Sequence, residues 1–235
     1  MVIGGFDPFS LLDYPDKVAA IIFTQGCNFR CRYCYNPSLI EVSTKGGYEL
    51  SQLWSFLAER QGLVEAIVIT GGEPTLQKDL VEVIKEIKLR GFLIKLDTNG
   101  TNPAIVKDLI AQNLIDYLAV DVKAPWSKYD QIMALPEAVL ASLVANVQEL
   151  VTWLINKSPI HYEFRTTLVP GLLGLQDIAE LAKELKGAQR WYLQRGRLDG
   201  NLLDSGLAGQ PPFTEVEMNN FLAIAQAEIR GAAIR

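Results

Sequence analysis

The chain has 235 residues, of which 49% are hydrophobic, and its formal net charge is −5. Its mean hydropathy is +0.13, and its length is ordinary for one α/β domain with a full core. The sequence lacks the block of lysine and arginine that is expected of a nucleic-acid-binding protein. No apolar run approaches the roughly 20 residues that cross a bilayer. We therefore expect a soluble, cytoplasmic domain over 1–235, with its core at about 17–195 and a C-terminal loop and helix at 196–235.

Short apolar runs alternate with longer helical patterns along the chain, which is typical of βα units in a parallel sheet. Six strands are predicted, at 18–24, 66–70, 92–97, 117–121, 160–167 and 190–194. Apolar residues at helical spacing predict helices at 76–90, 139–155 and 215–229. The segment 196–212 is rich in Gly, Asp, Asn and Pro, so we expect a loop there. Six such units without a dinucleotide-binding glycine motif favour an open, incomplete (β/α)6 TIM-like barrel.

The first predicted strand runs directly into the three cysteines of the chain, Cys27, Cys31 and Cys34. Their C-x3-C-x2-C spacing lets one loop bind three irons of a [4Fe-4S] cube and leaves the fourth iron without a protein ligand. A structural zinc site prefers four protein ligands, and the single histidine, His161, lies far along the chain. A disulfide framework is expected in small secreted chains with paired cysteines, and inert buried cysteines have no reason to gather at ligand spacing. The spacing therefore predicts an iron-sulfur cluster with an open iron.

The later predicted strands end in residues suited to a ligand. The second is followed by Gly71 and Gly72, which let a backbone approach a ligand closely, and by Glu73, which can accept hydrogen bonds. Charged side chains end the third, fourth and fifth strands: Lys95, Asp97, Asp121, Lys123 and Arg165. Residues two apart on a strand share a face, and charges are costly to bury unless they are paired or bound to a ligand. Each could be a structural ion pair or a solvated end; together they predict one cavity for a ligand with charges of both signs.

These motifs resemble known families. The cysteine loop, with Tyr33 before its last cysteine, resembles that of the radical S-adenosylmethionine (radical SAM) superfamily, and Gly71-Gly72-Glu73-Pro74 resembles its GGEP motif. Five segments resemble the glycyl-radical-enzyme activases, most of all the anaerobic ribonucleoside-triphosphate reductase activating proteins; they are 9–17, 26–37, 97–100, 121–125 and 165–171. Pyruvate formate-lyase activating enzymes are also similar, and the resemblance covers most of residues 3–195.

The resemblance implies an enzyme that reductively cleaves S-adenosylmethionine (SAM) at a [4Fe-4S] cluster and generates a glycyl radical on a partner enzyme. The implied partner is anaerobic ribonucleotide reductase, and the implied electron donor is a flavodoxin or a ferredoxin-type protein. Cys27, Cys31 and Cys34 would hold the cluster. The implied SAM contacts are Tyr33, Gly71, Gly72, Glu73, Pro74, Asp97, Asn99, Asp121, Lys123 and Arg165. A monovalent cation is implied at Asp97, Thr98 and Asp121.

Two positions depart from the activase pattern, because Tyr35 stands where the family usually has histidine and Asp16 where it usually has glycine. Neither replaces a cluster ligand. No further cysteine exists for an auxiliary cluster, which disfavours the multi-cluster peptide-modifying enzymes. Two alternatives stay open: a stand-alone radical SAM enzyme acting on a small molecule such as a deazapurine precursor, and a non-catalytic iron-sulfur carrier that would need neither the GGEP motif nor the charged strand ends.

Overall fold

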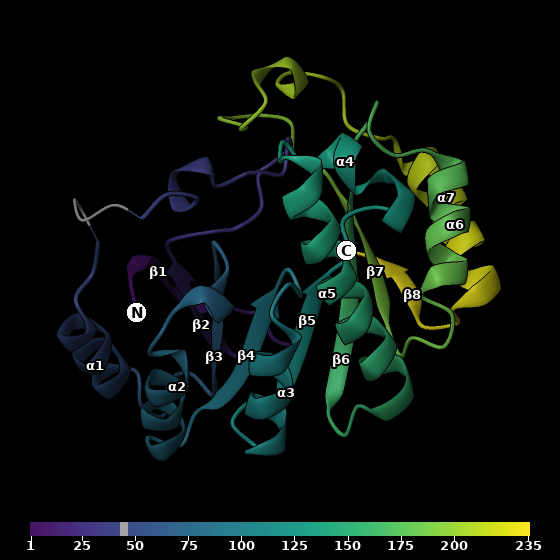
Figure 1. Ribbon diagram of the computed structural model, residues 1–235. Helices are drawn as coiled ribbons and strands as arrows, with labels where there is room; N and C mark the ends of the chain where they lie inside the picture. Colours follow the sequence, from purple (N-terminus) through teal and green to yellow (C-terminus); the bar gives the residue numbers. More distant parts are fainter. Residues whose placement is uncertain (43–46) are drawn as a thin grey trace. The chain divides into compact units, whose positions relative to one another are not determined.

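The computed structural model describes residues 1–42 and 47–235 (Figure 1). The chain forms two compact units, of which the first contains 1–28, 38–98 and 104–118, and the second contains 29–37, 99–103 and 119–235. The expectation of a single domain stays a prediction, and the two units are described separately below.

The first unit contains a sheet that begins with an antiparallel pair and continues in parallel. β1 (Ile3–Ser10) pairs antiparallel with β2 (Ala19–Thr24), and β3 (Ala66–Gly71) and β4 (Leu93–Thr98) follow in parallel. Its helical segments are α1 (Leu50–Glu59), the short 3-10 turns η1 (Pro37–Leu39) and η2 (Pro74–Leu76), α2 (Leu80–Leu89) and α3 (Pro103–Ala111), although the first residues of η1 and α3 belong to the second unit. Because β2 and β3 are buried on both faces, their apolar runs are nearly continuous, as is typical of parallel strands between two packed layers.

The strand β5 (Tyr117–Asp121) begins in the first unit and ends in the second. In the second unit β6 (His161–Leu168), β7 (Trp191–Arg195) and β8 (Ala232–Ile234) are parallel neighbours. The helical segments of this unit are η3 (Trp126–Lys128), α4 (Tyr129–Ile132), α5 (Glu137–Lys157), α6 (Leu175–Glu184), η4 (Ser205–Leu207) and α7 (Glu215–Glu228). Figure 1 shows α6 and α7 beside each other, near β7 and β8.

The six predicted strands correspond to β2–β7, and the predicted helices to α2, α5 and α7 with shifted ends. Two strands were missed. β1 contains Gly4, Gly5 and Pro8, which lack the alternating pattern of a strand, and it pairs with register shifts. β8 has only three residues, too few to show a period. Segment 196–212 is a loop as predicted, apart from the single turn η4.

The length and composition of α5 bear on the expectation that no apolar run is long enough to cross a bilayer. Among the described residues it alone is long and apolar enough to cross a bilayer, with a mean hydropathy of 1.6 over 18 residues. Its buried residues recur every three or four positions, which is the pattern of a helix packed by one face; they are Leu140, Val144, Val147, Leu150, Val151 and Leu154. One such helix is weak evidence for a membrane span, because helices of protein cores have the same composition.

Candidate active site

In the second unit, backbone hydrogen bonds hold the turn at 31–34, which is called the cysteine turn. The amide of Cys34 donates to the carbonyl of Cys31 at 2.9 Å, which closes a turn between two predicted cluster ligands. The amide of Arg32, inside that turn, donates to the carbonyl of Ile132 at the end of α4, at 3.0 Å. The turn therefore has a fixed position relative to the segment that follows β5.

Cys27 belongs to the first unit, where its amide donates to the carbonyl of Ile40 at 2.9 Å. The three cysteines are half-buried thiols rather than disulfides. Across residues 1–42 and 47–235, no three His, Cys, Asp or Glu side chains are grouped so as to hold one metal ion. A [4Fe-4S] cube poses a different requirement, because each thiolate binds a different iron. Cluster ligation by the cysteines stays a prediction.

The two glycines that end β3 are required by neighbouring backbone of the first unit. A Cβ on Gly71, whose φ is +114°, would stand 2.6 Å from the carbonyl oxygen of Thr24 and still closer to its nitrogen. A Cβ on Gly72 would collide with the carbonyl group of Gly26, the residue before Cys27. Packing alone therefore explains both glycines, and the expected approach to a ligand stays a prediction.

Glu73 is fully buried and its carboxylate connects two strand ends of the first unit. Its Oε1 accepts hydrogen bonds from the amide of Thr75 at 3.1 Å, from the Thr75 hydroxyl at 2.5 Å and from the Thr98 hydroxyl at 2.7 Å. Pro74, buried as well, begins η2. One oxygen of Glu73 thus fixes the turn after β3 to the end of β4.

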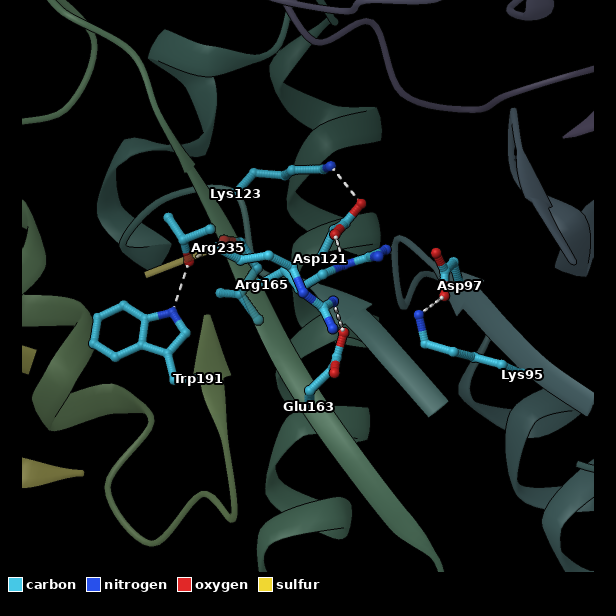
Figure 2. Close-up of polar contacts among 10 residues, drawn as sticks. Lys95, Asp97, Asp121, Lys123, Glu163, Arg165, Trp191 and Arg235 are labelled. Atoms are coloured by element: carbon cyan, nitrogen blue, oxygen red, sulfur yellow. Dashed lines mark hydrogen bonds and ion pairs between the residues drawn. The ribbon is translucent and has the colours of Figure 1, made fainter. Parts of the chain in front are cut away.

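Lys95 and Asp97 lie on one face of β4, as the two-residue spacing predicts. The Lys95 Nζ is 2.9 Å from Asp97 Oδ1, and the two side chains are 0% and 7% exposed (Figure 2). The ammonium also lies 5.9 Å from the ring centroid of Tyr117. This pair is sealed from water, so its charges are compensated inside the protein.

Asp121, at the end of β5, accepts from two cations of the second unit. Lys123 Nζ lies 2.8 Å from its Oδ2 and Arg165 Nε lies 2.9 Å from its Oδ1 (Figure 2). Burial of Asp121 opposes its ionisation, but Arg165 and then Lys123 outweigh that effect and lower the pKa of Asp121 to about 2. The Asp121 side chain is 27% exposed, so its carboxylate is accessible to solvent.

Tyr33 contributes an unsatisfied hydroxyl near the same cations. The residue is buried, and its Oη has no hydrogen-bond partner among the residues that the structure describes. Burial raises the pKa of Tyr33, while the nearby charge of Lys123 opposes that shift. Burial disfavours the Lys123 ammonium, but Asp121, then Tyr33 and Cys31, hold the pKa of Lys123 well above its usual value. The cysteine turn and the charged end of β5 are therefore electrostatic neighbours.

The sequence interpretation missed Tyr129, whose neighbourhood is set only by folding. Its hydroxyl accepts from the amide of Lys123 at 3.1 Å, and its ring lies 6.2 Å from that of Phe29 in the cysteine loop. No motif in the sequence marks this residue. Asn99, by contrast, was predicted to contact SAM, and its Oδ1 accepts from the amide and the hydroxyl of Thr101 at 3.0 and 2.7 Å.

The second unit thus combines features that fit a zwitterionic ligand. An accessible carboxylate between two cations matches amino and carboxylate groups, and a buried hydroxyl without a partner marks a position where a ligand could complete a hydrogen bond. The GGEP, Lys95 and Thr98 positions belong to the first unit, so their convergence on the same ligand stays a prediction.

Comparisons with known proteins find similar sequences and a similar fold over most of this chain. A family model described as the radical SAM superfamily matches residues 21–185. A Methanocaldococcus jannaschii protein provisionally named a glycyl-radical enzyme activating enzyme is 34% identical over 238 residues, which cover 100% of this chain and 95% of the relative. The pyruvate formate-lyase-activating enzyme of Streptococcus mutans is 26% identical, over 82% of this chain and 76% of its own. The crystal structure of a radical SAM methyltransferase from Sphaerobacter thermophilus has a TM-score of 0.68 at 20% identity, covering 94% of this chain and 67% of that one. These matches confirm the predicted fold class.

Proposed function

Because this chain belongs to the radical SAM superfamily and, within it, to the glycyl-radical enzyme activating enzymes, we propose that it generates the glycyl radical of anaerobic ribonucleotide reductase. The match to a relative over nearly the full length of both chains carries the activase assignment. The choice of partner is supported by five segments whose resemblance is greatest to the ribonucleotide reductase activases: 9–17, 26–37, 97–100, 121–125 and 165–171. We also place the reaction in the cytoplasm, with a flavodoxin or a ferredoxin-type donor.

Membership of the superfamily implies a [4Fe-4S] cluster and SAM. The cluster and SAM, when bound, supply the reductive cleavage that yields a hydrogen-abstracting radical. Cys27, Cys31 and Cys34 would hold three irons, since they are half-buried thiols in one short loop. The protein's own contribution is to orient the ligand and exclude water, because the hard chemistry belongs to the cofactor.

The charged end of β5 would orient SAM. Asp121 stays ionised through the physiological pH range because its pKa is about 2, and it can therefore accept from an amino or hydroxyl group at all working pH values. Lys123 and Arg165 stay protonated beside it and can donate to a carboxylate. The Tyr33 hydroxyl would complete its hydrogen bond on the same ligand. We propose Asp97, Thr98 and Asp121 as a monovalent cation site.

The first experiment asks whether the cluster forms. We expect anaerobically reconstituted protein to bind about four irons per chain, and Cys31→Ser to lose the intact cluster, measured by iron assay and by electron paramagnetic resonance (EPR) of the reduced protein. A Cys31→Ser variant with a full, redox-active cluster would overturn the assignment of that ligand.

The decisive experiment uses reductant, SAM and a purified anaerobic ribonucleotide reductase from the same organism. We expect a glycine-centred doublet in the EPR spectrum, absent when the partner's radical glycine is replaced by alanine. Pyruvate formate-lyase serves as the second partner, and a signal with it alone would reassign the partner while keeping the activase function. If neither enzyme gains a radical while a small metabolite is converted stoichiometrically with SAM cleavage, the alternative of a small-molecule enzyme replaces the proposal.

A further inference from the structure

The loop at 196–212 binds the cysteine turn directly. Within the second unit, the amide of Leu203 donates to the carbonyl of Cys34 at 3.3 Å, and the amide of Asp204 donates to the carbonyl of Arg32 at 2.8 Å. These residues are far apart along the chain, since Arg32 and Asp204 are separated by 172 positions. The C-terminal loop therefore follows the backbone of the turn that carries two of the three predicted cluster ligands.

Arg32 and Asp204 are also joined through their side chains. Both Nε and Nη2 of Arg32 approach the same carboxylate oxygen, Oδ2, at 2.9 and 2.8 Å. Hydrogen bonding from Arg32, followed by that from the amide of Gly206, lowers the pKa of Asp204. Asp204 thus donates its amide to the backbone carbonyl of Arg32 and accepts from the guanidinium of the same residue, which fixes both the backbone and the side chain of Arg32.

An ordinary surface ion pair is the simplest interpretation of this contact. The two side chains are 40% and 30% exposed, and pairs this accessible contribute little to folding stability. The position of the pair in the cysteine turn gives it a second effect, on the reduction potential of the cluster. Arg32 lies between Cys31 and Cys34, and the reduction potential of an iron-sulfur cluster depends on net charge and hydrogen bonds close to it. An unbalanced guanidinium there would favour the reduced, more negative cluster.

We propose that Asp204 is a positioning residue for the cysteine turn, and that with Arg32 it sets the balance of charge beside the cluster. The proposal rests on the cluster assigned under the proposed function. It gives the C-terminal loop a role in tuning the cluster, in addition to covering part of the cysteine turn.

The test compares three variants of the reconstituted protein without SAM or a partner: Asp204→Asn, Arg32→Gln and the double variant. The midpoint potential of the cluster is measured by redox titration followed by EPR. We expect Asp204→Asn to shift the potential in the positive direction, Arg32→Gln to shift it in the negative direction, and the double variant to fall between them. Shifts in the same direction for both single variants would mean that the pair acts only by holding the loop, and unchanged potentials would mean that its charge is not sensed; either result overturns the charge-balance proposal.

A second measurement needs no cluster. In cluster-free protein, we expect Asp204→Asn to raise the hydrogen exchange rate of the peptide 29–36 by at most about fivefold, the range for one exposed ion pair, and Asp204→Glu to restore much of the protection. Glu228→Gln is the matched control, because Glu228 pairs with Lys186 at 2.9 Å elsewhere in this unit. Unchanged exchange in Asp204→Asn would overturn the positioning role. If the wild-type protein binds no iron, the proposed function fails instead, and the exchange result still decides whether Asp204 holds the turn.

Discussion

The charged strand ends of the two units differ in their access to water. In the first unit, the side chains of Lys95 and Asp97 are 0% and 7% exposed and form a buried ion pair. In the second unit, Asp121 is 27% exposed, although it contacts two cations (Figure 2). Both arrangements include two charged residues spaced two positions apart at the end of a strand, so sequence spacing alone does not separate them.

The difference indicates two roles for one pattern. A sealed ion pair costs desolvation energy that its partners must offset, and removing one partner leaves a buried charge. An accessible carboxylate with two cations can exchange water for a ligand at little cost. We infer that the Lys95–Asp97 ion pair stabilises the scaffold, and we propose that the second unit's charged group contacts the ligand.

The largest loss of unfolding free energy is expected at Gly71, which lies against the backbone of Thr24. Gly71→Ala should lower the free energy of unfolding by about 3 kcal/mol or more, because its Cβ would meet the backbone of Thr24 at a positive φ. Gly62→Ala is the matched control, since its φ is +79° but, apart from Gly62 and its two chain neighbours, no heavy atom of the described residues lies within 4 Å of the new Cβ. The control should cost about 1 kcal/mol. Equal losses in urea denaturation would remove the packing explanation for Gly71.

Breaking the sealed pair should have an effect of similar size. Lys95→Met leaves the Asp97 carboxylate buried without the Lys95 ammonium, and we expect a loss of about 3–5 kcal/mol in unfolding free energy. The control is Lys17→Met, which breaks an exposed pair with Glu65 at 2.7 Å and should cost less than about 1 kcal/mol. If thermal unfolding gave similar losses for both variants, the contrast between sealed and open strand ends would be wrong.

Removing one member of the second unit's charged group should weaken ligand binding. Asp121→Ala and Lys123→Ala are each expected to weaken SAM binding by about 1.5–3 kcal/mol, the range for hydrogen bonds to charged groups, with iron content unchanged. Isothermal titration of the reconstituted protein measures the affinity, and Lys186→Met on the protein surface is the control. Unaltered affinity in both variants would show that Asp121 and Lys123 form a purely structural ion pair.

Glu184 and Asp121 are two carboxylates of the second unit with different partners. Glu184 accepts from the amide of Trp126, whereas Asp121 accepts from two cations. Burial, reinforced by Glu180 and opposed by the Trp126 amide, raises the pKa of Glu184 to about 7. A raised carboxyl pKa means that the folded state binds the proton more tightly, so this contribution to stability is present at low pH and is lost as pH rises from about 4.5 to about 7.

The expected effect is the smallest of the four. At pH 8, Glu184→Gln should be more stable than wild type by about 1 kcal/mol, after allowance for partial solvent exposure, and at pH 4.5 the two should be nearly equal. Denaturant titrations at the two pH values measure the difference, with the exposed Glu59→Gln as control. A pH-independent difference would show that Glu184 is not buried as the structure has it.

The family and the order of strands and helices were predictable from the sequence, because hydrophobic periodicity and ligand spacing are local properties. The three cysteines, the GGEP motif and the alternating charges of β4 and β5 each occupy a few consecutive positions, so one chain is enough to find them. β1 and β8 escaped prediction since Gly4, Gly5 and Pro8 hide the strand pattern in one and the other is only three residues long.

Only the tertiary structure decided which charges are sealed and which are open, because burial depends on residues far away in the chain. The same holds for the unsatisfied hydroxyl of Tyr33 and for the contact of Asp204 with Arg32 across 172 positions. A loop rich in Gly, Asp and Asn carries no local signal of its partner. Its docking on the cysteine turn is set by the packing around it, and that is why the sequence identified the predicted cluster ligands but not the residue that positions their turn.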